Sequence, residues 1–153
     1  MQITHTAITG KENVVSVVQS PYEALVEFYD AFNHRKMKLM EKNWANTPDI
    51  AMDNPLGGIM RGWKSIHKVY QRIFEGQAKV YVEFYDYSLH QTSDFFYAVG
   101  RERGFFESKG QRIDLAIRTS RIFQKTEQGW KQVHHHGSIE IPSLLETYQN
   151  LVK

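Results

Sequence analysis

The sequence of 153 residues contains no cysteine. This absence excludes disulfides, thiol nucleophiles and zinc sites built on thiolates. Apolar runs are short, and none approaches the roughly 18 residues that span a membrane. The first ten residues lack the basic start and apolar middle of a signal peptide. Together these absences predict a cytoplasmic protein with no membrane partner.

An excess of charge of one sign is also missing. Lys and Arg number 19, Asp and Glu 17, and the net charge is +2. Charges of both signs are interspersed, so a nucleic-acid-binding protein with a basic patch is not expected. The excess lies instead in aromatic residues, which make up 13% of the chain. A chain of this length predicts a single domain, residues 1–153, with one core.

The first half of the chain has helical spacing. Ser20, Pro21 and Glu23 form a capping box before an apolar stripe that repeats every three or four residues. The predicted helices cover about residues 21–34, 37–44 and 62–76. Residues 14–18 contain four valines and predict either a short edge strand or an extra helical turn.

After Gly76 the apolar period changes from 3.6 to 2, which is typical of strands. The predicted strands cover residues 79–91, 95–107, 111–125 and 130–140, with a short earlier strand at 50–55 and a closing helix at 142–152. Helices on one face of a strongly curved antiparallel sheet form an α+β layer fold. Such a fold encloses a cone-shaped space in which a pocket is plausible.

One arginine falls on an apolar strand face. Along residues 111–125 the odd positions are apolar and should face the core, and Arg121 shares that face. A buried cation is costly unless it is paired, so Arg121 needs an acidic partner or an anionic ligand. Both interpretations stay open: Arg121 binds a ligand, or it snorkels or pairs with a structural acid.

A second arginine lies among rings on the neighbouring strand. On residues 95–107 the odd face carries Tyr97, Arg101 and Phe105. If both odd faces lie on one side of the sheet, Arg101 and Arg121 converge in an aromatic pocket that suits a carboxylate. The alternative is a salt-bridge network with one of three acids, Glu102, Glu107 or Asp114.

The run His134-His135-His136 is the most conspicuous motif. In a strand, His134 and His136 share one face with Gln132, and His135 faces the other way. A His-x-His pair can ligate a metal, but no second motif supplies further ligands, so no metal is expected. We favour His134 and His136 as hydrogen-bonding residues of the pocket or core, with a surface or interface position as the alternative. Trp44 and Trp63, on helical inner stripes, are read as core or pocket lining.

The segment Trp130–Ser138, with its Trp-x-x-Val-His-x-His-x-Ser order, and the Asn54-Pro55…Gly62-Trp63 segment resemble the nuclear transport factor 2-like superfamily. This superfamily includes SnoaL-like cyclases, ketosteroid isomerase and the association domain of calcium/calmodulin-dependent protein kinase II, and the ending is most similar to the last. The resemblance covers about residues 21–141, leaving extensions at 1–19 and 142–153. It implies a cystatin-like cone fold and a deep polar pocket in which Arg101 and Arg121 meet carboxylates.

The resemblance to ketosteroid isomerase argues against that enzyme's reaction. Its catalytic aspartate corresponds to Asn54, its oxyanion-hole tyrosine to Phe28, with Tyr29 one residue away, and its oxyanion-hole acid to Thr119. An amide cannot act as a general base, and a threonine cannot act as a protonated carboxylic acid. Steroid isomerisation by that mechanism is therefore not expected.

Two functions remain. The first is a small-molecule-binding protein or enzyme whose conical pocket takes a small, partly apolar acid; an enzyme would be an isomerase- or cyclase-like acid–base catalyst without metal or cofactor. Its catalytic candidates are His134 and His136. Its ligand-binding candidates are Arg101, Arg121, Trp44, Asn54, Trp63, Tyr97, Phe105 and Thr119. The second is a non-catalytic association module that forms a homodimer or higher oligomer through a sheet face carrying Phe96, Phe106 and Ile122.

Overall fold

The computed structural model describes residues 2–4, 6–14, 16 and 18–153. Its helices are α1 (Pro21–Asn33), α2 (Met37–Asn43), α3 (Trp63–Glu75) and α4 (Pro142–Val152). Its strands are β1 (Gln2–Thr4), β2 (Ala51–Asp53), β3 (Ile59–Arg61), β4 (Lys79–Gln91), β5 (Phe95–Ser108), β6 (Gln111–Thr126) and β7 (Gly129–Ile139).

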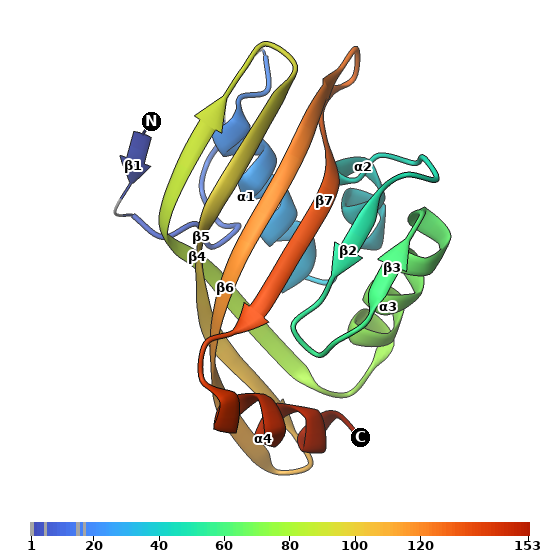
Figure 1. The fold of residues 1–153 in the computed structure, drawn as a ribbon, viewed down its shortest axis with the longest axis vertical. Helices are drawn as coiled ribbons and strands as arrows, with labels where there is room; N and C mark the ends of the chain where they lie inside the picture. The colour runs from blue at the N-terminus through green and yellow to red at the C-terminus, as the bar shows by residue number, and fades with distance from the viewer. Residues whose placement is uncertain (1, 5, 15, 17) are drawn as a thin grey trace.

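These strands form one sheet in the order β1-β4-β5-β6-β7-β2-β3. Neighbours run antiparallel, except that β2 runs parallel to β7. Helices α1, α2 and α3 lie on one side of the long, bent strands, and α4 crosses one end of the sheet (Figure 1). The result is a cone-shaped α+β fold, which confirms the fold class predicted from the sequence.

The predicted helices and long strands are confirmed to within one or two residues at most ends. Ser20 caps α1 as expected, because its hydroxyl accepts a hydrogen bond from the backbone N–H of Glu23 at 3.2 Å. The three-residue strands β1 and β3 were missed, since so short a segment shows no period. Val14 and Val18 lie in neither a strand nor a helix, so neither predicted structure forms there, and Val15 and Val17 are outside the described residues.

The inner face of the sheet, against the helices, carries the core. On β6 the odd positions point inward as predicted, including the buried Leu115, Ile117 and Phe123. On β5, however, the even positions point inward, because Ala98 pairs directly with Arg121 and paired residues share a face. Phe96 is fully buried and stacks on Phe123 with ring centroids 4.6 Å apart.

Glycine explains why the inner face of β5 was misjudged. A Cβ at Gly100 would lie 2.6 Å from the Cβ of Tyr87 and 2.9 Å from Cε1 of Phe84. Rings from β4 occupy the space above Gly100, so no larger side chain fits there. For this reason the even face of β5 looks less apolar in the sequence than it is in the structure. The prediction that Phe96 and Phe106 form an outer, subunit-binding face is wrong, since both are buried in the core.

A candidate ligand pocket

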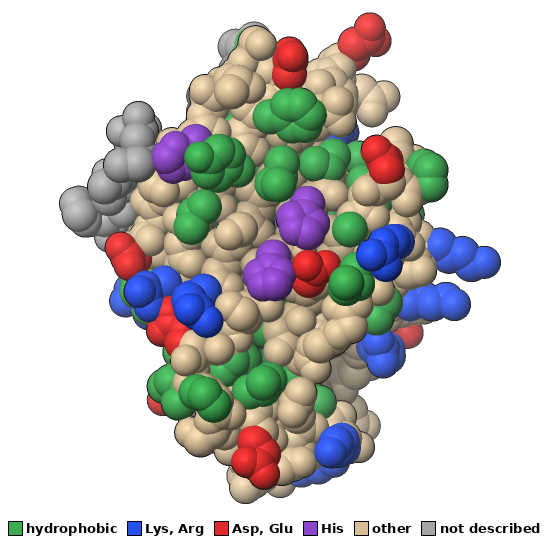
Figure 2. All heavy atoms as spheres, in the orientation of Figure 1, with side chains coloured by type: hydrophobic (Ala, Val, Ile, Leu, Met, Phe, Trp, Pro, Cys, Tyr) green, Lys and Arg blue, Asp and Glu red, His purple; other side chains and the backbone are tan. Residues whose placement is uncertain are grey.

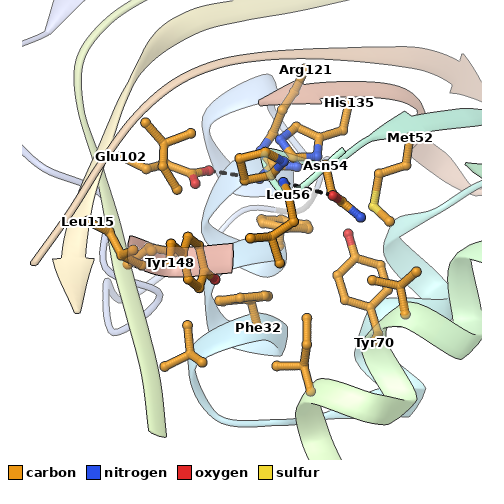
Figure 3. Close-up of a pocket in the computed structure, with 17 residues that line it drawn as sticks. Phe32, Met52, Asn54, Leu56, Tyr70, Glu102, Leu115, Arg121, His135 and Tyr148 are labelled. Carbon is orange, nitrogen blue, oxygen red and sulfur yellow. Dashed lines mark hydrogen bonds and ion pairs between the residues drawn. The ribbon is translucent and has the colours of Figure 1, made fainter. Parts of the chain in front are cut away.

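A cavity of about 100 Å³ lies between the inner face of the sheet and helices α1, α3 and α4 (Figure 3). Most of its wall is apolar and comes from Phe28, Phe32, Val69, Ile73, Leu115 and Ile117. A few polar side chains from separate strands and helices reach the same space: Asn54, Tyr70, Glu102, Arg121, His135 and Tyr148. An apolar wall with a small number of convergent polar groups is the usual composition of a small-molecule site.

The polar end of the cavity is built on a buried ion pair. Nη2 of Arg121 donates to Oε1 of Glu102 at 2.8 Å, and the two side chains are 2% and 6% exposed. The guanidinium carbon of Arg121 lies 3.6 Å from the centroid of the Phe28 ring. Burial works against the charge, but Tyr29 and Glu102 raise the pKa of Arg121 above its ordinary value, so the guanidinium stays charged.

Further hydrogen bonds fix this pair in place. Nη1 of Arg121 donates to Oε1 of Gln132 at 2.8 Å, and Nε donates to the hydroxyl of Tyr29 at 3.3 Å. The Tyr29 hydroxyl in turn donates to Glu102 at 2.6 Å. Gln132 donates to Asn43 at 3.1 Å, which connects the network to α2. The ion pair therefore belongs to a network that spans the sheet and two helices.

His135 enters the cavity because β7 contains a bulge. The register of β7 against β6 shifts between Ile122, which faces His134, and Phe123, which faces Gln132, so Val133 is left over. A bulge reverses the alternation of side chains beyond it. As a result both Gln132 and His135 point inward, although sequence alternation places them on opposite faces.

The ring of His135 is buried, and neither of its nitrogens has a hydrogen-bond partner within the described part of the chain. Burial lowers the pKa of His135 well below its ordinary value, and the charge of Arg121 and the neighbouring His134 and His136 lower it further. The imidazole is therefore neutral at neutral pH, with one nitrogen donating and the other accepting.

Two tyrosines add hydroxyl groups to the site. Burial raises the pKa of Tyr70 and of Tyr148 to about 12, so both keep their protons near neutrality. Asn54 is held by a hydrogen bond that its Oδ1 accepts from the backbone N–H of Leu56 at 3.0 Å. The pocket thus combines neutral hydrogen-bonding groups with one balanced ion pair.

Of the residues predicted to bind a ligand, Arg121 and Asn54 line the cavity. Trp44 is buried behind Tyr70, with ring centroids 6.5 Å apart, and Trp63 is half-buried against His67; neither lines this cavity. Thr119 faces inward between Gly100 and Gly137 but is also absent from the lining. Its hydroxyl is buried and has no partner among the residues that the structure describes.

The predicted convergence of Arg101 and Arg121 is wrong. Arg101 pairs with Arg118 across β5 and β6, on the outer face, whereas Arg121 points inward. Arg101 forms ion pairs with Asp86, at 3.0 Å, and with Glu140. Tyr97 and Phe105 share the outer face with Arg101, so they do not shape the cavity. The expectation of a carboxylate ligand rested on these two arginines, and the structure places them on opposite faces of the sheet.

The predicted catalytic histidines also face outward. The bulge at Val133 turns His134 and His136 to the outer face, where Nδ1 of His136 lies 3.1 Å from Oδ2 of Asp53. Of the three histidines in the run, His135 lines the cavity, and His134 and His136 do not. Sequence reasoning missed Glu102, the partner of Arg121, as a site residue, and named it only as an acid in an alternative salt bridge.

Two features that other functions require are absent from the described residues. No group of three or more His, Asp or Glu side chains there is arranged to hold a metal ion. None of the described helices is both long and apolar enough to cross a membrane.

The helix-covered curved sheet defines a cone-shaped α+β domain with a cavity between its two layers. Comparison with protein families then places the chain: residues 22–142 match the model of the SnoaL-like domain. The protein therefore belongs to the SnoaL-like family. No curated protein matches the chain.

Solved structures show the same fold. A putative calcium/calmodulin-dependent protein kinase type II association domain from Thiobacillus denitrificans is 22% identical, with a TM-score of 0.66 over 83% of this chain and 100% of that chain. A putative dehydratase of the NTF2-like family from Streptomyces avermitilis is 18% identical, with a TM-score of 0.67 over 77% and 92%. A protein with a cystatin-like fold from Caulobacter vibrioides is 16% identical, with a TM-score of 0.64 over 85% and 94%.

Proposed function

We propose that the protein binds a small, largely apolar molecule in the cavity between the sheet and α1, α3 and α4. The observation that carries this proposal is the pair of unpartnered nitrogens on buried His135, which lines a largely apolar space. A buried polar atom without a partner is costly, so such atoms usually mark the place of a water or a ligand. The family and the solved relatives support a fold with room for a pocket.

A catalytic form of this proposal assigns the acid–base role to His135. A neutral imidazole can accept or donate a proton within a largely apolar site, and Tyr70 supplies a protonated hydroxyl to the same cavity. An isomerase- or cyclase-like reaction needs no more than such groups and a positioned substrate. Arg121 and Glu102 would orient the substrate through the charge-balanced end of the cavity.

Native mass spectrometry of freshly purified protein, followed by an NMR screen of small organic molecules, tests binding. We expect a retained ligand or a hit that shifts the signals of cavity side chains. Leu115→Phe, which fills part of the cavity from its buried wall, should abolish binding while the fold persists. Val99→Phe, on the exposed outer face, is the matched control and should bind normally. A broad screen without any cavity-directed hit on folded protein would contradict the proposal.

A second candidate function is self-association through the outer face of the sheet. Phe95, Tyr97 and Val99 alternate along β5 and are 44%, 45% and 44% exposed. Hydrophobic side chains gather on this face beside histidines (Figure 2). A contiguous apolar group on a sheet face is typical of a subunit interface. The same face supports a dimer in which each copy keeps its own pocket, and light scattering of the purified protein tests it.

A further inference from the structure

We infer that the ligand of this cavity is an uncharged molecule whose polar group both accepts and donates hydrogen bonds, such as a primary amide or an alcohol, and is not a carboxylate. This inference rests on the proposed function, since it concerns the chemistry of what the cavity binds. Three features of the polar end lead to it: its balanced charge, the protein partners that take most of the donors of Arg121, and the open donor and acceptor of His135.

The charge of the cavity is already balanced. Among the described residues that line it, Arg121 and Glu102 are the two that carry charge, and they pair at 2.8 Å. A carboxylate would bring an unpaired negative charge into an apolar space and lie close to the carboxylate of Glu102. Burying an unpaired charge is far more costly than burying a hydrogen-bonded neutral group.

Most of the hydrogen-bond donors of Arg121 are also bound to the protein. Each of its three nitrogens already donates a hydrogen bond: Nε to Tyr29, Nη1 to Gln132 and Nη2 to Glu102. Its flat face lies over Phe28 at 3.6 Å. Two of its five N–H groups remain, one on each Nη nitrogen. A ligand carboxylate that accepted from them would lie beside Glu102, so one positive charge would face two buried negative charges.

His135 defines the complementary requirement. Its neutral ring presents one N–H donor and one nitrogen acceptor, and the described residues satisfy neither. A carboxylate has only acceptor atoms, so it can satisfy at most the donor. A primary amide or a hydroxyl offers both functions and can satisfy both nitrogens, directly or through one water.

The cavity also limits the size of the ligand. Its volume of about 100 Å³ is smaller than the roughly 150 Å³ of an engineered cavity that binds benzene. A branched hydrocarbon group with a single polar head therefore fits the space better than a fused ring system does. Isobutyramide and isobutyrate meet this limit, share one carbon skeleton and differ in charge.

NMR titration of the whole protein at neutral pH with these two compounds tests the inference. We expect isobutyramide to shift the methyl signals of Val69, Leu115 and Ile117, which line the cavity. Isobutyrate should bind at least about tenfold more weakly, because its charge has no partner there.

A charge variant sharpens the test. Glu102→Gln leaves Arg121 without its opposing charge, so the preference should reverse and isobutyrate should bind more tightly than isobutyramide. Glu107→Gln is the matched control, since Glu107 lies on the same strand, is 37% exposed and does not line the cavity. It should keep the wild-type preference. If Glu102→Gln does not fold, the wild-type comparison decides alone.

The outcomes separate the inference from the proposed function. Tighter binding of isobutyrate than of isobutyramide to the wild-type cavity would overturn the inference and leave the pocket itself supported. Binding of neither compound would overturn the inference too, while a ligand retained through purification would still support the proposed function. Selective binding of the amide, reversed in Glu102→Gln, would support both.

Discussion

At the scale of single residues, burial of polar side chains determines the site. Alternation along residues 111–125 predicts that Arg121 points inward and needs an acidic partner, and the structure supplies Glu102. The sequence does not identify Glu102 as this partner. In the strand register Glu102 pairs with Ile117, and its side chain reaches Arg121 diagonally, past Thr119. A long side chain contacts residues that spacing rules do not pair.

The buried neutral His135 predicts a pH dependence of stability. Its pKa is lowered in the folded state, so the unfolded chain binds a proton that the folded chain does not. The stabilising contribution is therefore complete above the ordinary histidine pKa of about 6.5 and is lost as the pH falls below it. The loss approaches about 1.4 kcal/mol per pH unit.

Urea unfolding of wild type and His135→Gln from neutral pH to about pH 5 measures this contribution. The variant should lose less free energy of unfolding than wild type over this range, because glutamine does not titrate. Parallel curves for the two proteins would show that His135 is protonated in the folded state and would contradict its placement in an apolar site.

At the scale of elements, helix caps and turns make the positions of helices and strands predictable from the sequence, whereas irregular strand pairing is not predictable in this way. Helix α1 was predicted from its capping box, and the four long strands from their period and the turns between them. The bulge at Val133 could not be predicted, because no glycine or proline marks it and it follows from the pairing of β7 with β6. That single residue reverses the faces of the histidine run, so His135 reaches the cavity and His134 and His136 do not.

Deletion of Val133 tests the role of this bulge. The deletion joins Gln132 to His134, so Gln132 and His135 lie two residues apart and face inward by regular alternation, with the pairing to β6 unchanged. The variant should therefore keep the hydrogen bond to Arg121 and the buried imidazole, and its free energy of unfolding should fall by no more than about 2 kcal/mol. Val133→Ala keeps the bulge and should cost no more than about 1–2 kcal/mol. Loss of the pH dependence that His135 gives to stability, in the deletion variant alone, would contradict this account of the bulge.

At the scale of the whole molecule, the sheet separates two environments. The inner face encloses the cavity and the ion pair, and the outer face displays Phe95, Tyr97 and Val99 together with the Arg101 ion pairs. Part of the aromatic excess lies in the cavity wall, where Phe28, Phe32 and Tyr70 contribute rings. The cone fold was predictable because segregated helices and long strands have few ways to pack.

Self-association through the outer face predicts a specific response to charge. Tyr97→Asp places a carboxylate in the centre of the exposed apolar group and should convert a dimer to a monomer at micromolar concentration, measured by light scattering. Ile59→Asp is the matched control, since Ile59 is 53% exposed on β3, away from that group. It should leave the mass unchanged. A monomeric wild-type protein would reject the proposed interface.

The buried ion pair also constrains how this chain can diverge in sequence. Loss of either Arg121 or Glu102 alone leaves a lone buried charge, which costs about 3–5 kcal/mol, whereas joint replacement by apolar residues of similar volume is close to neutral. The two positions are therefore epistatic, because each single substitution lowers the stability of the fold and the double substitution does not. Related chains should keep both residues or neither, and a change in the polarity of the pocket should appear at both positions at once.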